Sequence, residues 1–553
     1  MEPQIFVDKL KFNDGYEMTI GHSDIVIFTG ANNAGKSQAL KDIDTLMSAK
    51  SVSGIVVTTL DTDYTGDILS KIDDYKQKDG YYHISNNAYS REEDILNMWK
   101  KKDPRFAHEY KNRLDTETRL NISKTSPSFD VLNAEPSTPA QRLYVDDKLE
   151  KKISELFHEA FNAYLILNIR GGSMIPIHVG QTPKMDVGED RGSTSYLEKL
   201  RPLPLLEAQG DGMRSFAGIL FDVFTSTKTV TMIDEPEAFL HPPQARLLGR
   251  MLVKNKPNDR QLFISTHSED FLKGLLDADS DNVKIVRINR EGNTNNIKTL
   301  NNEDVKSLWK DSILRYSNIL SGLFHSKVVI CESDTDCRFY QAMLNALYEG
   351  QNKVSPDILF THCGGKERFK AVIPALKALD VKTVVVADFD VLDNEVTFKT
   401  ICEKMGIGWD NLKSKWKSVY DIVEKQSTQL ETEDVKRELQ AILDGITTPQ
   451  LSDDDIEAIK SKLKASSAWS KVKKIGKTYF SGSIRSDLDD LMNSCKEKGF
   501  LIVPIGELEC FYKSLASNST HGTKWLNLVM GKDLSNDPEL EEARKFVMEI
   551  ETL

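Results

Sequence analysis

The stretch from Asp24 to Met47 constrains the fold of this chain more than any other. An apolar run, Asp24-Ile-Val-Ile-Phe-Thr29, leads directly into Gly30-Ala-Asn-Asn-Ala-Gly-Lys-Ser37, and a helical pattern follows over Gln38–Met47. This is the GxxxxGK[ST] pattern in the setting that it requires, namely a buried strand, a glycine-rich loop and a helix whose N-terminus faces the loop. The stretch therefore predicts an α/β fold with a phosphate-binding loop at a strand end.

The loop predicts a bound nucleotide. Its glycines let backbone N–H groups curl around the β-phosphate, its lysine reaches the β- and γ-phosphate oxygens, and its hydroxyl residue ligates Mg²⁺. We therefore expect ATP and one Mg²⁺ ion here. The expected binding residues are Gly30, Asn32, Asn33, Gly35, Lys36 and Ser37.

Two later strands carry further residues of a nucleotide site. The run TVTMIDE is an apolar strand ending in Asp234, which we expect in the Mg²⁺ shell, and Glu235, which we expect to polarise the attacking water. The run QLFISTH ends in His267, a residue suited to sensing the γ-phosphate. Upstream, Gly210, Asp211 and Gly212 lie before an apolar helix, where ABC-type ATPases carry their signature loop.

The run IDEPEAFLHP, residues 233–242, closely resembles the Walker B region of the ABC/SMC-like ATPases of the OLD ("overcoming lysogenization defect") family. The resemblance implies that two heads sandwich ATP, with the Gly210–Gly212 loop of one subunit touching the γ-phosphate held by the other. A homodimer or higher homo-oligomer follows. SMC-like proteins insert a coiled-coil arm before the signature loop, but sustained heptads are missing here, so we expect a shorter helical insertion for dimerisation at about residues 85–165.

Acids follow two strands in the C-terminal half. They are Glu332 and Asp336 after the run VVIC, and Asp388 and Asp390 after the run VVVA. Because the carboxyl ends of parallel strands converge on the ligand crevice of an α/β sheet, these acids should lie together. Four like charges are costly unless a divalent metal neutralises them, and hard oxygen ligands suit Mg²⁺ or Mn²⁺.

This order of acids looks like a TOPRIM domain, shared by topoisomerases, primases and OLD-family nucleases. The first motif is usually EGxxD, and Ser333 replaces the glycine here. The resemblance implies that Glu332 is the catalytic acid/base or a metal ligand, that Asp388 and Asp390 bind one ion, and that Asp336 binds a second.

The run GELECF, residues 506–511, resembles the C-terminal OLD motif. It implies another metal-binding acid, for which we choose Glu509 over Glu507. OLD nucleases also carry a lysine further on that stabilises the transition state. Lys524 is the first choice for this catalytic lysine, and Lys513 is the alternative.

Together these patterns predict an ABC/SMC-like ATPase domain over residues 1–325 and a Rossmann-like TOPRIM domain over residues 326–553, with a second helical insertion at about 398–490. Inside that insertion, residues 459–477 hold seven lysines around Trp469. Such a segment lines a nucleic-acid groove in some proteins and is a solvated helix face in others, and the sequence leaves both interpretations open.

Composition narrows the class of protein. The net charge of −12 argues against a broadly basic nucleic-acid coat, although a local groove is compatible with it. All six cysteines lie in the C-terminal half without CxxC spacing, and apolar runs fall short of the ~20 residues of a membrane span. We therefore expect a reduced, cytoplasmic protein without a membrane partner.

The expected activity is ATP-regulated nucleic-acid cleavage that depends on Mg²⁺ or Mn²⁺, with two ions in the TOPRIM site. DNA is the first choice of substrate. The alternatives are cleavage of RNA such as tRNA, and a non-cleaving ATP-switched sensor or scaffold. The resemblance also implies bacterial anti-phage defence, either alone, beside a helicase (as in Gabija) or beside a retron reverse transcriptase with its small DNA.

Overall fold

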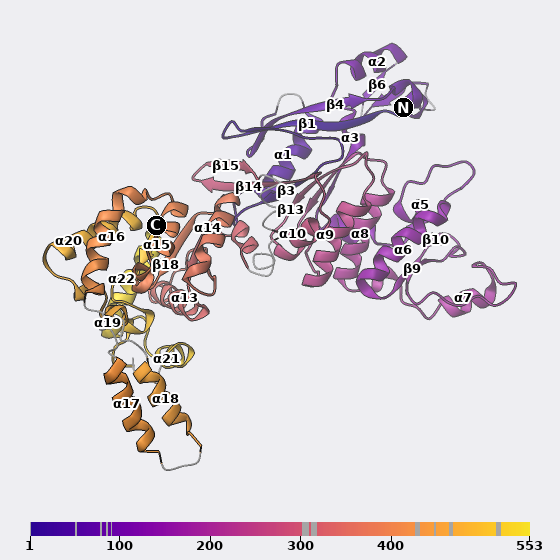
Figure 1. Ribbon diagram of the computed structural model, residues 1–553. Coiled ribbons are helices and arrows are strands. Elements are labelled where there is room, and N and C mark those ends of the chain that lie inside the picture. Colours follow the sequence, from indigo (N-terminus) through magenta and orange to yellow (C-terminus); the bar gives the residue numbers. More distant parts are fainter. Residues whose placement is uncertain are drawn as a thin grey trace. The chain divides into compact units, whose positions relative to one another are not determined.

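The chain forms two compact units, Met1–Phe324 and His325–Leu553. The computed structural model describes residues 2–49, 52–77, 80–84, 87–89, 91–300, 309–310, 318–425, 432–446, 450–463, 468–515 and 521–553. Figure 1 shows the elements of both units, and each unit is described by itself below. Within the described residues, no helix combines the length and the apolar character that a membrane crossing requires.

The first unit is built on a six-stranded sheet with the order β15-β14-β3-β13-β12-β7. Neighbouring strands are parallel, except that β15 runs antiparallel to β14. The strands are β3 (Ile25–Thr29), β7 (Lys111–Leu114), β12 (Val230–Asp234), β13 (Gln261–Ser265), β14 (Val283–Glu291) and β15 (Thr294–Thr299).

Both faces of this sheet are covered, which explains why its central strands are continuous apolar runs. Every residue of β3 and β13 is buried. On one face, Val26 and Phe28 share a core with Leu40 and Ile43 of α1 (Lys36–Ser48). A small antiparallel sheet of β1 (Gln4–Phe12), β2 (Glu17–Thr19) and β4 (Val57–Thr65) contributes to the same core.

Three helices lie on the other face (Figure 1), and the last two of them pack against each other. They are α8 (Asp211–Thr225), α9 (Pro242–Asn255) and α10 (Glu269–Asp277). Helix α8 is buried along almost its whole length, from Ser215 to Thr225. The signature-like loop at the start of α8 is therefore joined to a helix that is buried in the core of the first unit.

Residues 85–165 were expected to form a helical insertion, but this segment also contains a strand of the main sheet. Strand β7 lies inside it and pairs in parallel with β12, so this segment completes the main sheet. Helix α4 (Thr116–Ile122), which follows β7, packs against α8. The prediction failed because β7 is only four residues of mostly polar sequence, KNRL, and carries no apolar run that would signal a buried strand.

The first unit contains further helices and strands. Before β7 in the chain come η1 (Ile68–Tyr75), β5 (Tyr82–Ile84), β6 (Asn87–Tyr89), α2 (Glu92–Lys100) and α3 (Ala107–Tyr110). A lateral part contains β8 (Ser126–Pro127), α5 (Pro139–Val145), α6 (Asp147–Phe161), β9 (Tyr164–Leu167), β10 (Met174–Ile175), β11 (Ile177–Gly180), α7 (Thr194–Leu200) and η2 (Leu206–Ala208).

The second unit is built on a four-stranded parallel sheet with the order β17-β16-β18-β19. The strands are β16 (Lys327–Cys331), β17 (Ile358–His362), β18 (Thr383–Ala387) and β19 (Phe500–Ile502). Helix α13 (Asp334–Glu349) follows β16 and begins with a reciprocal cap between Ser333 and Asp336. This cap fixes the direction of the chain directly after the first acid.

Helices surround this sheet. The first unit ends with η3 (Leu320–Phe324). In the second unit, η4 (Lys366–Arg368) and α14 (Phe369–Ala378) follow β17. Between β18 and β19 lie η5 (Phe389–Asp393), α15 (Glu395–Met405), α16 (Trp409–Glu424), α17 (Thr432–Asp444), α18 (Asp453–Leu463), α19 (Ala468–Ile475), η6 (Gly476–Tyr479) and α20 (Gly482–Lys496). The chain continues through η7 (Leu508–Phe511), α21 (Thr523–Val529), η8 (Pro538–Leu540) and α22 (Glu541–Thr552).

An aromatic cluster holds α13, α21 and α22 on one face of this sheet. The ring of Phe339 lies 5.2 Å from that of Trp525 and 5.9 Å from that of Phe511, and Tyr340 lies 5.6 Å from Phe546. All five side chains are buried in one core with Val329 and Val384 of the sheet. The carboxyl ends of β16 and β18 are thereby held on a packed base.

Candidate nucleotide and metal sites

The glycine-rich loop is shaped by close backbone contacts. Gly30 has a φ of +143°, and a Cβ there would lie 2.1 Å from the Ile288 carbonyl oxygen, so a side chain has no space. Asn295 of β15 clamps the other end of the loop, because its Nδ2 donates to the Ala34 carbonyl at 2.6 Å. Asn13 Nδ2 in turn donates to Asn295 Oδ1 at 2.9 Å. The loop is therefore fixed by residues that the motif does not contain.

Lys36 is buried and its ammonium lies inside the loop. Nζ donates to the carbonyl oxygens of Gly30 at 2.9 Å and Ala31 at 2.8 Å. A cation in this position is what phosphate oxygens require. The loop thus has the geometry expected of a nucleotide cradle.

The acids of β12 meet the loop. Ser37 Oγ donates to Asp234 Oδ1 at 2.8 Å, and Ser265 Oγ at the end of β13 donates to the same oxygen. Next to them, His267 Nε2 lies 3.4 Å from Glu235 Oε1. Burial and the nearby Lys36 ammonium lower the pKa of His267, which favours the neutral imidazole. The structure therefore brings Ser37, Asp234, Glu235 and His267 together.

Two charged residues outside the predicted site residues hold this strand end. Arg119 of α4 is fully buried and donates to the backbone oxygens of Asp234 at 2.6 Å and Glu235 at 3.2 Å. Glu237 Oε1 accepts from Thr266 Oγ1 at 2.9 Å and from the His267 amide at 2.7 Å, and burial raises the pKa of Glu237. Glu237 is part of the run IDEPEAF, but Arg119 carries no sequence signal.

The signature-like loop meets the turn after β12. Gly210 is the N-cap of α8, and a Cβ on Gly212 would lie 2.7 Å from the Phe239 carbonyl oxygen. Arg214 Nη1 lies 3.0 Å from Asp211 Oδ1. These contacts explain why glycine stands at 212. The contact of this loop with ATP on another subunit stays a prediction.

In the second unit, the predicted acids lie at the carboxyl edge of the sheet. Glu332 follows β16, and its Oε1 accepts a hydrogen bond from the Asp388 amide, after β18, at 3.1 Å. Asp336 Oδ2 accepts from the Ser333 amide at 2.8 Å. Burial, reinforced by Asp390, raises the pKa of Glu332 to about 7. Burial also raises the pKa of Asp336 and, more strongly, of Asp388.

A lysine from α19 enters this acid cluster. Lys473 Nζ lies 3.1 Å from Asp388 Oδ2, 3.3 Å from Asp390 Oδ2 and 3.8 Å from Glu507 Oε2. Although burial opposes it, the charges of Asp388 and Asp390 raise the pKa of Lys473. A second lysine, Lys366, lies 3.4 Å from Asp390 Oδ2.

These positions bear on the two interpretations of residues 459–477, of which 464–467 lie outside the described residues. Lys473 reaches the acid cluster with about 29% of its side chain exposed, whereas Lys471 and Lys474 of the same helix are exposed. Trp469 is buried, and its Nε1 donates to Glu424 Oε1 at 3.0 Å, so its ring is unavailable for stacking on a base. The sequence hid this because seven similar lysines surround one tryptophan, and their spacing does not show which of them faces the sheet.

A third group of ligand-type residues follows β19. One ligand atom each of Glu507, Glu509 and His521 lies within 4.8 Å of the others. Glu509 Oε1 accepts from the Gly522 amide at 2.8 Å and lies 3.4 Å from His521 Nδ1. His521 was missed because it lies twelve residues beyond the acid. Lys524 is exposed in the first turn of α21, and Lys513 is exposed as well.

The donor set fits divalent cations. Carboxylates dominate it, as hard ions require, and their mutual repulsion calls for positive charge. Asp390 Oδ1 is moreover buried without a hydrogen-bond partner, so its lone pairs remain available to a cation. Glu332, Asp336, Asp388, Asp390 and Glu509 are the residues that would hold such ions.

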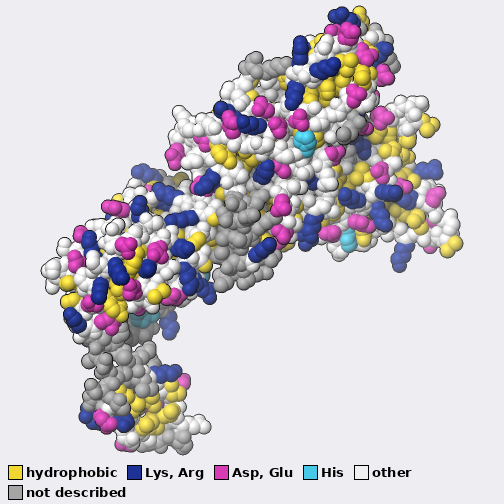
Figure 2. Space-filling model, turned by 45° about the horizontal axis from the view of Figure 1, so that its top comes forward, with side chains coloured by type: hydrophobic (Ala, Val, Ile, Leu, Met, Phe, Trp, Pro, Cys, Tyr) yellow, Lys and Arg dark blue, Asp and Glu magenta, His cyan; other side chains and the backbone are white. Residues whose placement is uncertain are grey.

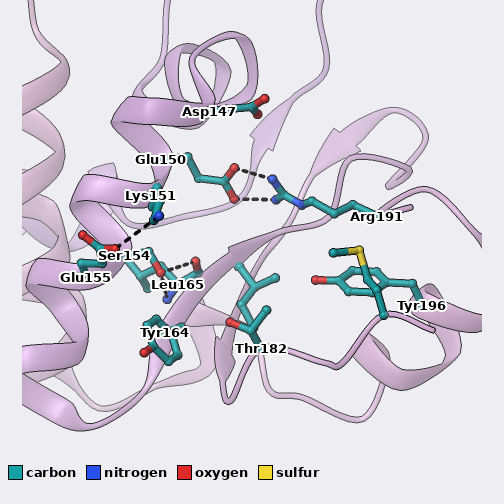
Figure 3. A pocket seen from close by; sticks show the side chains of 12 residues that line it. Asp147, Glu150, Lys151, Ser154, Glu155, Tyr164, Leu165, Thr182, Arg191 and Tyr196 are labelled. Carbon is teal, nitrogen blue, oxygen red and sulfur yellow. Dashed lines mark hydrogen bonds and ion pairs between the residues drawn. The ribbon is translucent and has the colours of Figure 1, made fainter. Parts of the chain in front are cut away.

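The lateral part of the first unit contains a separate cavity of about 430 Å³ (Figure 3). Its lining residues include neither the nucleotide loop nor the acid cluster. Arg191 lines it and donates to both carboxylate oxygens of Glu150 of α6, from Nη1 at 2.7 Å and from Nη2 at 2.6 Å. Gln181 directly precedes Thr182 of this lining, and its Nε2 donates to the Asn162 carbonyl at 2.8 Å.

Comparison with known families places an ATPase domain and a TOPRIM domain on this one chain. Residues 185–272 match the family described as "AAA domain, putative AbiEii toxin, Type IV TA system". Residues 323–390 match the family described as "Overcoming lysogenization defect protein-like, TOPRIM domain". The predicted fold class and the predicted resemblance to the OLD family are confirmed by these matches.

Two curated relatives are similar to this chain. The Old nuclease of Escherichia phage P2 is 27% identical over 177 residues, which are 30% of this chain and 29% of the relative. The OLD nuclease of Thermus scotoductus (strain ATCC 700910 / SA-01) is 31% identical over 169 residues, 29% of this chain and 30% of the relative. The similarity thus spans less than a third of the length of either relative.

Solved structures of SMC heads share limited similarity with the chain. A crystal structure of the SmcHead bound to the C-winged helix domain of ScpA has a TM-score of 0.35 at 14% identity, covering 55% of this chain and 99% of that one. The SMC head domain from Thermotoga maritima has a TM-score of 0.28 at 13% identity, covering 54% and 100%.

Proposed function

We propose that this protein is an ATP-regulated, divalent-metal-dependent endonuclease that cleaves DNA. The observation that carries the proposal is the convergence of Glu332, Asp388 and Asp390 at the carboxyl edge of one parallel sheet, with Asp336 on the adjoining helix turn. The similarity to two proteins named OLD nuclease supports the same chemistry.

In this proposal, divalent ions, when bound, activate a water molecule and stabilise the leaving 3′-oxygen of a phosphodiester. Glu332 moves the proton. In the ion-free site, burial raises its pKa to about 7, and the hydrogen bond from the Asp388 amide fixes one of its oxygens for the proton transfer. Lys524 follows Glu509 in the chain and is exposed in the first turn of α21, and it is our candidate for the transition-state lysine.

ATP binding supplies the regulation. Ser37 and Asp234 hold the Mg²⁺ of the nucleotide, Glu235 orients the attacking water, and His267 contacts the γ-phosphate. Two subunits associate through their ATPase domains, with Gly210–Gly212 of one completing the site of the other. This association controls access of DNA to the TOPRIM acids.

The physiological role that we propose is anti-phage defence in the bacterial cytoplasm, alone or with a helicase or a retron reverse transcriptase and its small DNA. All six cysteines are free thiols, which fits a reducing compartment. Charges of both signs alternate over the face shown in Figure 2, so we expect the DNA contacts to be local to the acid cluster.

Cleavage assays test the proposal against its two alternatives. Purified protein is incubated with plasmid, linear and single-stranded DNA and with tRNA, with and without Mg²⁺ or Mn²⁺. Cleavage of tRNA alone would favour an RNA nuclease, and intact substrates throughout would favour a non-cleaving ATP-switched scaffold.

Two loss-of-ligand variants and one matched control test the site. Asp388→Ala should abolish cleavage and leave ATP binding intact. Asp336→Asn should lose activity as well, whereas Asp334→Asn, a change to an exposed acid in the same helix turn, should keep it. Retained cleavage in Asp388→Ala would remove that residue from the metal site.

A further inference from the structure

The side chain of Lys473 occupies the place that the proposed metal ions require. Its ammonium lies within 3.1–3.8 Å of carboxylate oxygens of Asp388, Asp390 and Glu507. We propose that Lys473 is an internal counter-ion that neutralises the acid cluster before a divalent ion binds and is displaced when the ion arrives, so that it sets the metal concentration at which the site loads. The inference rests on the proposed metal site.

The backbone of Lys473 is fixed, so that only its side chain is free to move. A Cβ on Gly506 would lie 1.9 Å from the Lys473 carbonyl oxygen, and one on Gly476 would lie 2.3 Å from the Pro504 carbonyl oxygen. The Lys477 amide donates to the same Pro504 oxygen at 2.8 Å. The end of α19 is thus packed against the loop that carries the GELE motif, and this contact aims the lysine at the acids.

Simultaneous binding of the lysine and a metal ion is unfavourable. A divalent ion such as Mg²⁺ takes carboxylate oxygens at about 2.0–2.1 Å. The ammonium of Lys473 lies 3.1 Å from Asp388 Oδ2, so an ion bound to this oxygen would lie next to a positive charge. About 29% of the Lys473 side chain is exposed, which gives the flexible stem a path out of the cluster.

Lys366, the other lysine at Asp390, is held differently. Its Nζ donates to Asp393 Oδ1 at 3.0 Å and to the backbone oxygen of Asp390 at 2.8 Å. Its Nζ also lies 3.4 Å from Asp390 Oδ2, but neither hydrogen bond uses that carboxylate, so Lys366 keeps both bonds when an ion binds. Lys473 therefore competes with the ion, and Lys366 supports the ligand.

The test is Mn²⁺ binding to the full chain without nucleotide or nucleic acid, measured by isothermal titration calorimetry and by electron paramagnetic resonance of free Mn²⁺. Lys473→Met keeps the aliphatic stem and removes the charge. It should bind Mn²⁺ about tenfold more tightly than the wild type, because no ion pair has to be broken first. Lys473→Arg should not bind more tightly than the wild type, and the matched control Lys471→Met, an exposed lysine of α19, should bind like it.

Thermal unfolding gives a second readout. Without metal, Lys473→Met should melt at a lower temperature than the wild type, since the acids lose their counter-ion. Adding Mn²⁺ should raise the melting temperature of Lys473→Met by more than that of the wild type. If Lys473→Met folds only with Mn²⁺, the proposal is supported. If both Lys473→Met and Lys473→Gln stay unfolded with Mn²⁺, the lysine is a structural element and the proposal is overturned.

Equal or weaker Mn²⁺ binding by Lys473→Met would also overturn it. Asp388→Ala separates this failure from failure of the metal site itself. Binding that is lost in Asp388→Ala but unchanged in Lys473→Met refutes the lysine's role alone. If Mn²⁺ binds to none of the three proteins (wild type, Lys473→Met and Asp388→Ala), the metal site is refuted and the inference with it.

Discussion

Replacement of Arg119 by methionine tests whether one buried guanidinium holds the acids of the nucleotide site. Arg119 is fully buried and donates to the backbone oxygens of Leu114 at 3.2 Å, Asp234 at 2.6 Å and Glu235 at 3.2 Å, and to Ser215 Oγ at 3.0 Å. Methionine fills most of the same volume but donates to none of them.

The cost follows from the acceptors left behind. Each buried acceptor that loses its partner costs about 1–3 kcal/mol. Burial lowers the pKa of Arg119, which shows that the charge itself is unfavourable there, and its removal offsets part of the loss. We expect Arg119→Met to lower the free energy of unfolding of the first unit by about 2–4 kcal/mol.

Urea unfolding followed by far-UV circular dichroism measures this change, and Arg113→Met is the matched control. Arg113 precedes the same helix but is about a third exposed, with its closest acids 3.8 Å away, so its loss should cost less than ~1 kcal/mol. Equal effects of the two substitutions, or a loss below ~1 kcal/mol in Arg119→Met, would refute the reasoning.

Three further outcomes are expected. Lys36→Ala should lose ATP binding in a fluorescent-nucleotide assay, because the phosphates lose the cation that lies in the loop; unchanged affinity would contradict this role. Glu235→Gln should bind ATP but hydrolyse it at least ~10²-fold more slowly in a phosphate-release assay, and an unchanged rate would exclude Glu235 as the general base. The pKa of Glu332 is raised to about 7. The folded, metal-free protein therefore holds a proton that the unfolded chain releases at lower pH. The stability contributed by this group is lost as the pH rises through about 7. Since Mn²⁺ needs the ionised carboxylate, the gain in melting temperature on adding Mn²⁺ should be larger at about pH 8 than at about pH 6; a gain that shrinks with rising pH would contradict the assignment.

The sequence predicts those parts of the sites in which strand, turn and side chain are contiguous. The loop at Gly30–Ser37, the acids after β12 and the acids after β16 and β18 all follow apolar strands that the structure contains. In each case a continuous run of buried residues fixes where the strand ends, and the functional residue comes directly afterwards.

The parts that escaped prediction depend on contacts between distant segments. Strand β7 reaches the sheet only because β12 offers it a parallel edge, and its four residues carry no pattern of their own. His521 meets Glu509 only through the turn that brings the Gly522 amide to the same carboxylate. The spacing of residues along the chain does not predict contacts between such distant segments.

Arg119 and Lys473 show the same principle in the two units. Each motif places acids at the carboxyl end of a parallel strand, where their repulsion has to be balanced. In each unit a basic side chain from a helix outside the motifs lies at these acids. Arg119 donates to the backbone at the end of β12, and Lys473 pairs with the carboxylates after β18. The difference in partner decides the difference in behaviour. Arg119 is bound to carbonyl oxygens that no metal ion claims, so it stays in place, whereas Lys473 shares its oxygens with the expected ion and has to leave. The first is therefore tested by stability and the second by metal affinity.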